Sequence, residues 1–164
     1  MILTNFFRNI EVARKEIAQK IRGKYYSILL DKVGKNLIVY GKIIIKAPEN
    51  IRIGDNCKIN DNVFIHGAGG IDIADNVTIS AFAKIISIGY ETSNWNKIYD
   101  TKLHKCSPVY IGEGTWICSG ATILPGVSIK GKGVILAANT VISKDIVEDF
   151  VVVAGNPGKI VKRY

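Results

Sequence analysis

Large aliphatic residues recur at every sixth position along most of this chain. A spacing of six is neither the period of a helix nor the two-residue alternation of a strand. It is typical of a solenoid built from short flat faces. Three such units make one turn, and successive turns pair as parallel strands about 4.8 Å apart. The spacing therefore predicts an all-β solenoid with these interior residues: Ile53, Ile59 and Ile65; Ile73, Ile79 and Ile85; and Ile111, Ile117, Ile123, Ile129, Ile135 and Val141.

A second, smaller residue follows most of these aliphatic residues after four positions. Where the chain turns a corner of a tight coil, little space remains inside, so a small or medium side chain is expected there. The corner residues predicted in this way are Cys57, Val63, Val77, Ala83, Thr115, Ala121, Val127 and Gly133.

The spacing of six is interrupted twice. The step from Ile65 to Ile73 is eight, which predicts a bulge of two residues near 66–70. The step from Ile85 to Ile111 is 26, so roughly 20 residues leave the coil as one extended loop at about 89–107. Long loops in compact folds usually carry function or are disordered. The loop contains aromatic and polar side chains, which favours function.

The N-terminal region has a different pattern and predicts a cap. Phe6, Ile10, Ala13, Ile17 and Ile21 follow helical spacing, so we expect a helix at about 5–22 that ends near Gly23 or continues into 25–30. Residues 35–46 are rich in branched side chains and predict β structure. We therefore divide this single domain into an N-terminal helical and β cap, 1–46, and a repeat region, 47–164, and expect the cap to cover the open end of the solenoid.

The net charge of +8 is concentrated near the N-terminus. Residues 1–46 hold ten Lys or Arg and three acidic residues, which leaves only +1 for 47–164. A solvated helix face is the simpler interpretation, and weak contact with an anionic membrane surface is the alternative. No nucleic-acid partner is expected, because no binding motif accompanies the charge.

Three cysteines without a pairing pattern, no apolar stretch of membrane-spanning length and no signal peptide predict a cytoplasmic protein. It would lie at the inner face of the membrane if the basic segment binds lipid.

Three ordered segments carry a family resemblance over about 50–164: IGEGTWICSGATILPGVSI at 111–129, LAANTVISKDI at 136–146 and VVVAGNPGKIVKRY at 151–164. They resemble the hexapeptide-repeat acyltransferases, in the branch that holds maltose, galactoside and polysaccharide O-acetyltransferases. The resemblance implies a left-handed parallel β-helix, acetyl-CoA as acetyl donor, a sugar or glycan acceptor, and a homotrimer whose active sites lie between subunits.

Acetyl transfer to a hydroxyl needs a general base, and histidine suits that role because its pKa lies near neutral. The chain has only two histidines, His66 and His104. In the resembling enzymes the catalytic His follows a Gly just before the loop, where this chain has Tyr90. Three alternatives stay open: His104 at the far end of the loop is the base, His66 at the bulge is the base, or neither is.

The resemblance also implies binding residues. Between Ile129 and Lys144 the chain has one residue more than the resembling enzymes, so Ala137 remains an alternative to Ala138. Trp116 either packs or flanks the thioester. The residues expected to contact the acetyl donor are Trp116, Ser119, Ala138, Ser143, Lys144, Lys159 and Lys162, and those expected to contact the acceptor are Tyr90, Glu91 and Trp95.

The sequence therefore predicts an acetyl-CoA-dependent O-acetyltransferase that modifies a sugar hydroxyl of a glycan or glycan precursor. An N-acetyltransferase acting on an amino sugar and a non-catalytic solenoid scaffold are the alternatives. The presence of only two histidines argues against a γ-type carbonic anhydrase on the same fold, whose zinc needs three His ligands, and no metal is predicted.

Overall fold

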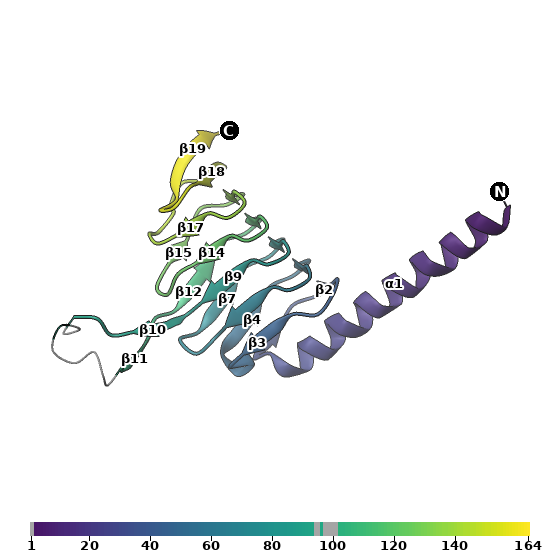
Figure 1. Ribbon diagram of the computed structural model, residues 1–164, viewed down its shortest axis with the longest axis horizontal. Coiled ribbons are helices and arrows are strands. Elements are labelled where there is room, and N and C mark those ends of the chain that lie inside the picture. The colour runs from purple at the N-terminus through teal and green to yellow at the C-terminus, as the bar shows by residue number, and fades with distance from the viewer. Residues whose placement is uncertain (1, 94–95, 97–101) are drawn as a thin grey trace.

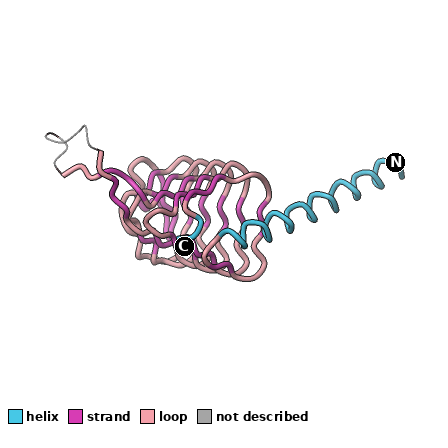
Figure 2. Tube along the Cα trace, turned by 90° about the horizontal axis from the view of Figure 1, so that it is seen from below, coloured by secondary structure: helices cyan, strands magenta, loops and turns pink. Residues whose placement is uncertain are grey.

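The chain winds into a left-handed parallel β-helix of about six coils. The computed structural model describes residues 2–93, 96 and 102–164, with side chains from residue 7 onward. The coils stack into a prism, and two segments leave it in different directions: the helix α1 (Ile2–Leu29) and the hairpin of β10 (Ile88–Tyr90) and β11 (His104–Cys106) (Figures 1 and 2).

Three sheets form the faces of the prism, and each coil gives one strand to each sheet. The first sheet contains β1 (Lys32–Val33), β4 (Ile51–Ile53), β7 (Ile71–Ile73), β12 (Val109–Ile111) and β15 (Ser128–Ile129). The second contains β2 (Ile38–Val39), β5 (Lys58–Ile59), β8 (Thr78–Ile79), β13 (Trp116–Ile117), β16 (Ile135–Leu136), β18 (Val151–Ala154) and the antiparallel β19 (Lys159–Arg163). The third contains β3 (Ile44–Lys46), β6 (Phe64–His66), β9 (Lys84–Ile86), β14 (Thr122–Ile123) and β17 (Val141–Ile142).

The interior of the prism consists of aligned aliphatic side chains, one above another. Ten of the twelve residues predicted from the spacing of six, from Ile53 to Ile129, are at most 4% exposed. Register explains the alignment, because Ile53 pairs with Ile73, Ile73 with Ile111, and Ile111 with Ile129.

The last two predicted interior residues and one predicted corner residue are wrong by one position. Leu136 and Ile142 are buried in place of Ile135 and Val141, and the corner is filled by Val134 rather than Gly133. The cause is the additional residue after Ile129. The amide groups of Lys130 and Gly131 both donate to the carbonyl oxygen of Ile146, so two residues share one acceptor and the next strand is displaced by one position.

Asn and Gly occupy the tight corners between the first and second sheets. Asn56, Asn76 and Gly114 stack in successive coils, and all have φ between 57° and 69°. This left-handed backbone is accessible to Gly and tolerated by Asn. The sequence can therefore turn the same corner in every coil.

The helix α1 is longer than predicted and does not end at Gly23. Gly23 is buried against the first coil, where an added Cβ would lie 2.4 Å from the carbonyl oxygen of Leu37. Glycine therefore serves close packing here, and the helix continues to Leu29. Only the C-terminal part of α1 meets the solenoid, and the rest extends away from it (Figure 1). The expectation that the helix covers the open end holds only for this part.

The solenoid begins earlier than the first interior isoleucine. Residues 35–46 are β structure, as predicted, and β1, β2 and β3 pair with β4, β5 and β6 as a complete first coil. The segment 32–46 is therefore a coil in its own right. None of the helices in the described part of the chain is long and apolar enough to cross a membrane.

The register shift gives a test of the core. Leu136→Ala should lower the free energy of unfolding by about 2–5 kcal/mol, because it removes a fully buried side chain from the stacked interior. Ile135→Ala is the matched control, and its half-exposed side chain should cost clearly less. Urea unfolding at one fixed protein concentration measures both. Equal losses, or a larger loss for Ile135→Ala, would contradict the register.

Candidate active site

The loop predicted at 89–107 begins and ends as an antiparallel hairpin with a buried serine at its base. Ser87 is fully buried, and its hydroxyl donates to the carbonyl oxygen of His66 (2.7 Å) and accepts from the amide of Gly69 (2.9 Å). The amide of Ser107 donates to the carbonyl oxygen of Ser87 (2.9 Å). One residue therefore joins both ends of the hairpin to the bulge at 66–70: its hydroxyl bonds to the bulge, and its carbonyl oxygen bonds to the returning strand.

The hairpin brings both histidines of the chain into one pocket. Its register pairs Tyr90 with His104, and their rings stack with centroids 4.8 Å apart. His66 lies at the end of β6, and its side chain meets the same face of the hairpin. The pocket has a volume of about 200 Å³ and is lined by His66, Ile88, Gly89, Tyr90 and His104.

The surroundings of His66 favour its neutral form. Burial lowers the pKa of His66 below its ordinary value, and the positive charges of Lys46 and His104 lower it further. A His with a lowered pKa remains uncharged at neutral pH and can accept a proton or a hydrogen bond. His104 is exposed on β11, whereas His66 is half-buried on a strand paired on both sides.

Glu91, which was expected to contact the acceptor, lies on the other side of the hairpin. Residues alternate between the two faces of a strand, so Glu91 and Lys105 lie opposite Tyr90 and His104. Their side chains form an ion pair of 3.0 Å between the two ends of the hairpin. The amide of Ser93 and this ion pair lower the pKa of Glu91 to about 2. Glu91 thus holds the hairpin together; Trp95 lies outside the described residues.

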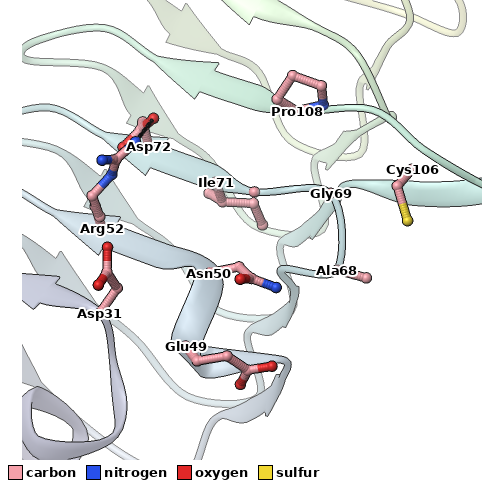
Figure 3. Close-up of a pocket in the computed structure, with 11 residues that line it drawn as sticks. Asp31, Glu49, Asn50, Arg52, Ala68, Gly69, Ile71, Asp72, Cys106 and Pro108 are labelled. Carbon is pink, nitrogen blue, oxygen red and sulfur yellow. Dashed lines mark hydrogen bonds and ion pairs between the residues drawn. The ribbon is translucent and has the colours of Figure 1, made fainter.

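A larger pocket, which the sequence did not reveal, lies on the first sheet beside the hairpin (Figure 3). Its volume is about 600 Å³. Glu49 and Asn50 extend from the turn η1 (Pro48–Asn50), and Cys106 closes the pocket from the base of the hairpin. The lining residues are Asp31, Glu49, Asn50, Arg52, Ala68, Gly69, Gly70, Ile71, Asp72, Cys106 and Pro108. The interruption at 66–70 was the only signal for it, because its charged residues come from separate coils.

Arg52 and Asp72 form a two-point ion pair in this larger pocket. The Arg52 guanidinium donates to both carboxylate oxygens of Asp72, at 2.6 and 3.0 Å, across β4 and β7. Asp31, Glu49 and Asn50 add acceptors and an amide. Carboxylate and amide groups of this kind can bind several hydroxyl groups at once.

The residues expected to contact the acetyl donor fall on two edges of the third sheet. Ser119 and Ala138 stack in neighbouring coils on the edge shared with the second sheet, because the amide of Asn139 donates to the carbonyl oxygen of Ser119 (3.0 Å). Register thus aligns Ala138, rather than Ala137, with Ser119. Trp116 is 48% exposed beside this edge, and its indole donates to the hydroxyl of Ser80 (3.0 Å).

The remaining predicted donor contacts lie at the C-terminal coils. Lys159 pairs with Ala154 at the end of β18, next to the edge that carries Ala138, and Lys162 lies 4.1 Å above the ring of Tyr164. Ser143 and Lys144 follow β17 and therefore lie on the other edge of the third sheet, which also carries His66. Three coils separate them from His66, or roughly 14 Å at the usual strand spacing.

The structure thus brings the two histidines and Tyr90 together but keeps them away from Trp116, Ser119 and Ala138 in the same chain. The first group can activate a hydroxyl, and the second forms an exposed edge of small side chains. No cluster of three or more potential metal ligands occurs among the described residues.

Comparisons with known proteins agree with this geometry. An assigned acetyltransferase of Saccharomyces cerevisiae is 36% identical over 135 residues, which cover 82% of this chain and 67% of that protein. WbbJ of Escherichia coli K12, assigned as a lipopolysaccharide biosynthesis O-acetyl transferase, is 31% identical and covers 80% of this chain and 67% of its own length. No family model matches the chain.

Among solved structures, a galactoside acetyltransferase in complex with coenzyme A superposes with a TM-score of 0.80 and 28% identity. The match covers 87% of this chain and 69% of that enzyme. The ordered motifs, the β-helix and these relatives together show that the chain belongs to the hexapeptide-repeat acetyltransferase family.

Proposed function

We propose that the protein is an acetyl-CoA-dependent O-acetyltransferase that acts on a sugar hydroxyl of a glycan or glycan precursor. The observation that carries this proposal is the pocket in which the hairpin gathers His66, His104 and Tyr90. The relatives point to the same chemistry, since one is a galactoside acetyltransferase that binds coenzyme A and another is assigned to lipopolysaccharide O-acetylation.

His104 is the general base in this proposal. The resembling enzymes keep their catalytic His at the position of Tyr90, and His104 lies directly across the hairpin from Tyr90 with the two rings stacked. The imidazole is thus supplied from the opposite strand at nearly the same place. His66, which remains neutral, holds the acceptor hydroxyl by a hydrogen bond.

The reaction follows from these roles. His104 takes the proton of the sugar hydroxyl while its oxygen attacks the thioester carbonyl carbon. The C–S bond of the tetrahedral intermediate then breaks, and the imidazolium returns the proton to the thiolate of coenzyme A. The products are an acetyl ester and a free thiol. Base catalysis of this kind contributes about 10²–10⁴-fold.

The larger pocket suits the rest of the acceptor. It lies beside the hairpin base, and its Asp31, Glu49 and Asn50 offer hydrogen-bond partners for the hydroxyl groups of a sugar. Its volume of about 600 Å³ exceeds that of the histidine pocket threefold, so it can accommodate the body of a sugar while one hydroxyl reaches the histidines.

The acetyl donor lies along the edge of Ser119 and Ala138. Small side chains there leave backbone amides accessible to the pantetheine arm, and Lys159 stands at the end of this edge for the nucleotide phosphates. Ser143 and Lys144 lie on the edge that carries His66 and therefore contact the donor that is bound to the neighbouring copy, and Lys162 is a further contact. Trp116 flanks the thioester.

The active site forms between subunits of a homotrimer. The histidine pocket and the edge of Ser119 and Ala138 lie on different edges of one chain, so a single copy cannot place the thioester beside His104. A closed ring of identical prisms brings the histidine edge of one copy to the donor edge of the next and gives three equivalent sites.

His104→Ala should lower kcat/KM for acetyl transfer about 10²–10⁴-fold and leave unfolding unchanged, because the side chain is exposed and serves as the base. A steady-state assay with matched hydroxyl and amino sugars measures the rate and separates O- from N-acetylation. Unchanged turnover would exclude His104 and leave His66 as the remaining candidate.

The double exchange Tyr90→His with His104→Tyr tests the proposed geometry more sharply. It returns an imidazole to the same pocket from the other strand and keeps the stacked pair. It should recover at least tenfold over His104→Ala. If the folded double variant recovered no activity, an imidazole on β10 could not replace the one on β11, which would contradict the proposed geometry.

Ala138→Trp should raise the dissociation constant of acetyl-CoA at least tenfold, because a bulky ring fills the edge on which the pantetheine arm lies. Val147→Trp is the matched control, since Val147 is 69% exposed and lies away from this edge. Calorimetry measures both variants. Absence of saturable binding by the unaltered protein would overturn the function itself and favour a scaffold.

A further inference from the structure

The helix α1 carries an apolar stripe that the solenoid does not cover. Residues of a helix advance by about 100° each, so those three, four and seven positions apart share a face. Ile17, Ile21 and Ile28 lie on one such face and are 58%, 63% and 76% exposed. Ile10 and Tyr25 extend the stripe and are also exposed.

The opposite face of the helix is the one that binds the solenoid. The Arg22 guanidinium donates to the carbonyl oxygens of Val39 and Tyr40, and the hydroxyl of Tyr26 donates to that of Ile43 (3.3 Å). Gly23 packs against Leu37 between them. Because this face is occupied, the apolar stripe is directed away from the prism.

Basic side chains lie within the stripe and along one of its borders. Residues 2–29 contain six Lys or Arg and two acidic residues, a net charge of +4. Lys20 and Lys24 lie along one border of the stripe, and Arg14 lies within it. Arg22 is on the opposite face, where it binds the solenoid. A helix with an exposed aliphatic face and basic side chains beside that face is typical of segments that lie in the interface of an anionic membrane.

The position of Arg14 favours a membrane over a second copy of the helix as the partner of the apolar stripe. Arg14 projects within the stripe between Ile10 and Ile17, and it is 77% exposed with only a 3.7 Å contact to Glu11. In a bundle of identical helices the stripe would bury this cation against its own copies, at a high cost. At a lipid surface the long side chain reaches the phosphate groups while its stem stays in apolar surroundings.

We propose that α1 docks its Ile10–Ile17–Ile21–Ile28 face on the surface of an anionic phospholipid membrane. What this docking would mean for binding of the sugar acceptor rests on the proposed function. Asp31 lines the larger pocket and lies two residues beyond the end of α1. A bound helix would therefore hold that pocket near the lipid surface, where the glycan of a lipid-linked acceptor is presented.

Flotation of the full chain with vesicles tests this proposal without reference to catalysis. The vesicles are phosphatidylcholine alone or equal parts of phosphatidylcholine and phosphatidylglycerol. We expect binding to the anionic vesicles at least tenfold above that to the neutral ones, and a loss of this excess at high salt. Binding that does not depend on anionic lipid, or no binding, would overturn the proposal.

Ile17→Asp with Ile21→Asp should reduce anionic-vesicle binding at least tenfold, because two carboxylates enter the docking face. Asn9→Asp with Val12→Asp is the matched control, since it also adds two carboxylates and both positions are exposed on another face of the helix. Circular dichroism checks that helix content is kept. An equal loss of binding in both variants would overturn the assignment of the docking face. The proposal would also be overturned if the unaltered protein did not bind vesicles and Ile17→Asp with Ile21→Asp changed its oligomeric state.

Discussion

Backbone pairing between coils is the constraint on which this structure depends. Each strand pairs with the strand one coil earlier and one coil later, so a side chain that points inward must stack on another that does so. Space inside the prism then restricts the choice to aliphatic residues on the faces and small residues at the corners. Insertions are accommodated only where the coil turns, and both interruptions of the spacing occur at corners.

Those corner insertions create the candidate site. The bulge at 66–70 hollows the first sheet, and the excursion after Ile86 becomes a hairpin whose base lies beside this hollow (Figure 1). Ser87 joins the two, because its hydroxyl bonds to residues of the bulge and its carbonyl oxygen to the return strand. The rigid solenoid thereby fixes the position of His66, while the hairpin register fixes His104 against Tyr90.

The fold was predictable from the sequence because each coil repeats the same short spacing along the chain. A spacing of six identifies interior residues without knowledge of any long-range contact, and it failed only after Ile129, where an added residue shifted Ile135 outward and Leu136 inward. The sequence left two ends for the helix, near Gly23 or within 25–30, because it does not show that Gly23 serves tertiary packing against Leu37. Local sequence contains no record of that contact.

The site was predictable only in part. The two histidines could be named as candidates from the sequence. That His104 lies in the same pocket as His66 depends on the register of the hairpin, which pairs Tyr90 with His104, 14 positions apart. Glu91, which was expected to contact the acceptor, forms an ion pair with Lys105 that the sequence did not reveal. The larger pocket draws Asp31, Glu49 and Asp72 from three separate segments, so no single motif encodes it.

The separation of the two halves of the site is the central claim, because it requires neighbouring copies to complete each other. Activity of mixed assemblies of His104→Ala and Ala138→Trp chains tests it most directly. At acetyl-CoA concentrations below its dissociation constant for the unaltered protein, each variant alone should keep at most about a tenth of the unaltered activity. If His104 of one copy serves the donor edge of the next, random mixing should restore about a quarter of the unaltered activity, since one pairing in four joins two intact halves. No recovery in assemblies shown to be mixed would contradict the claim.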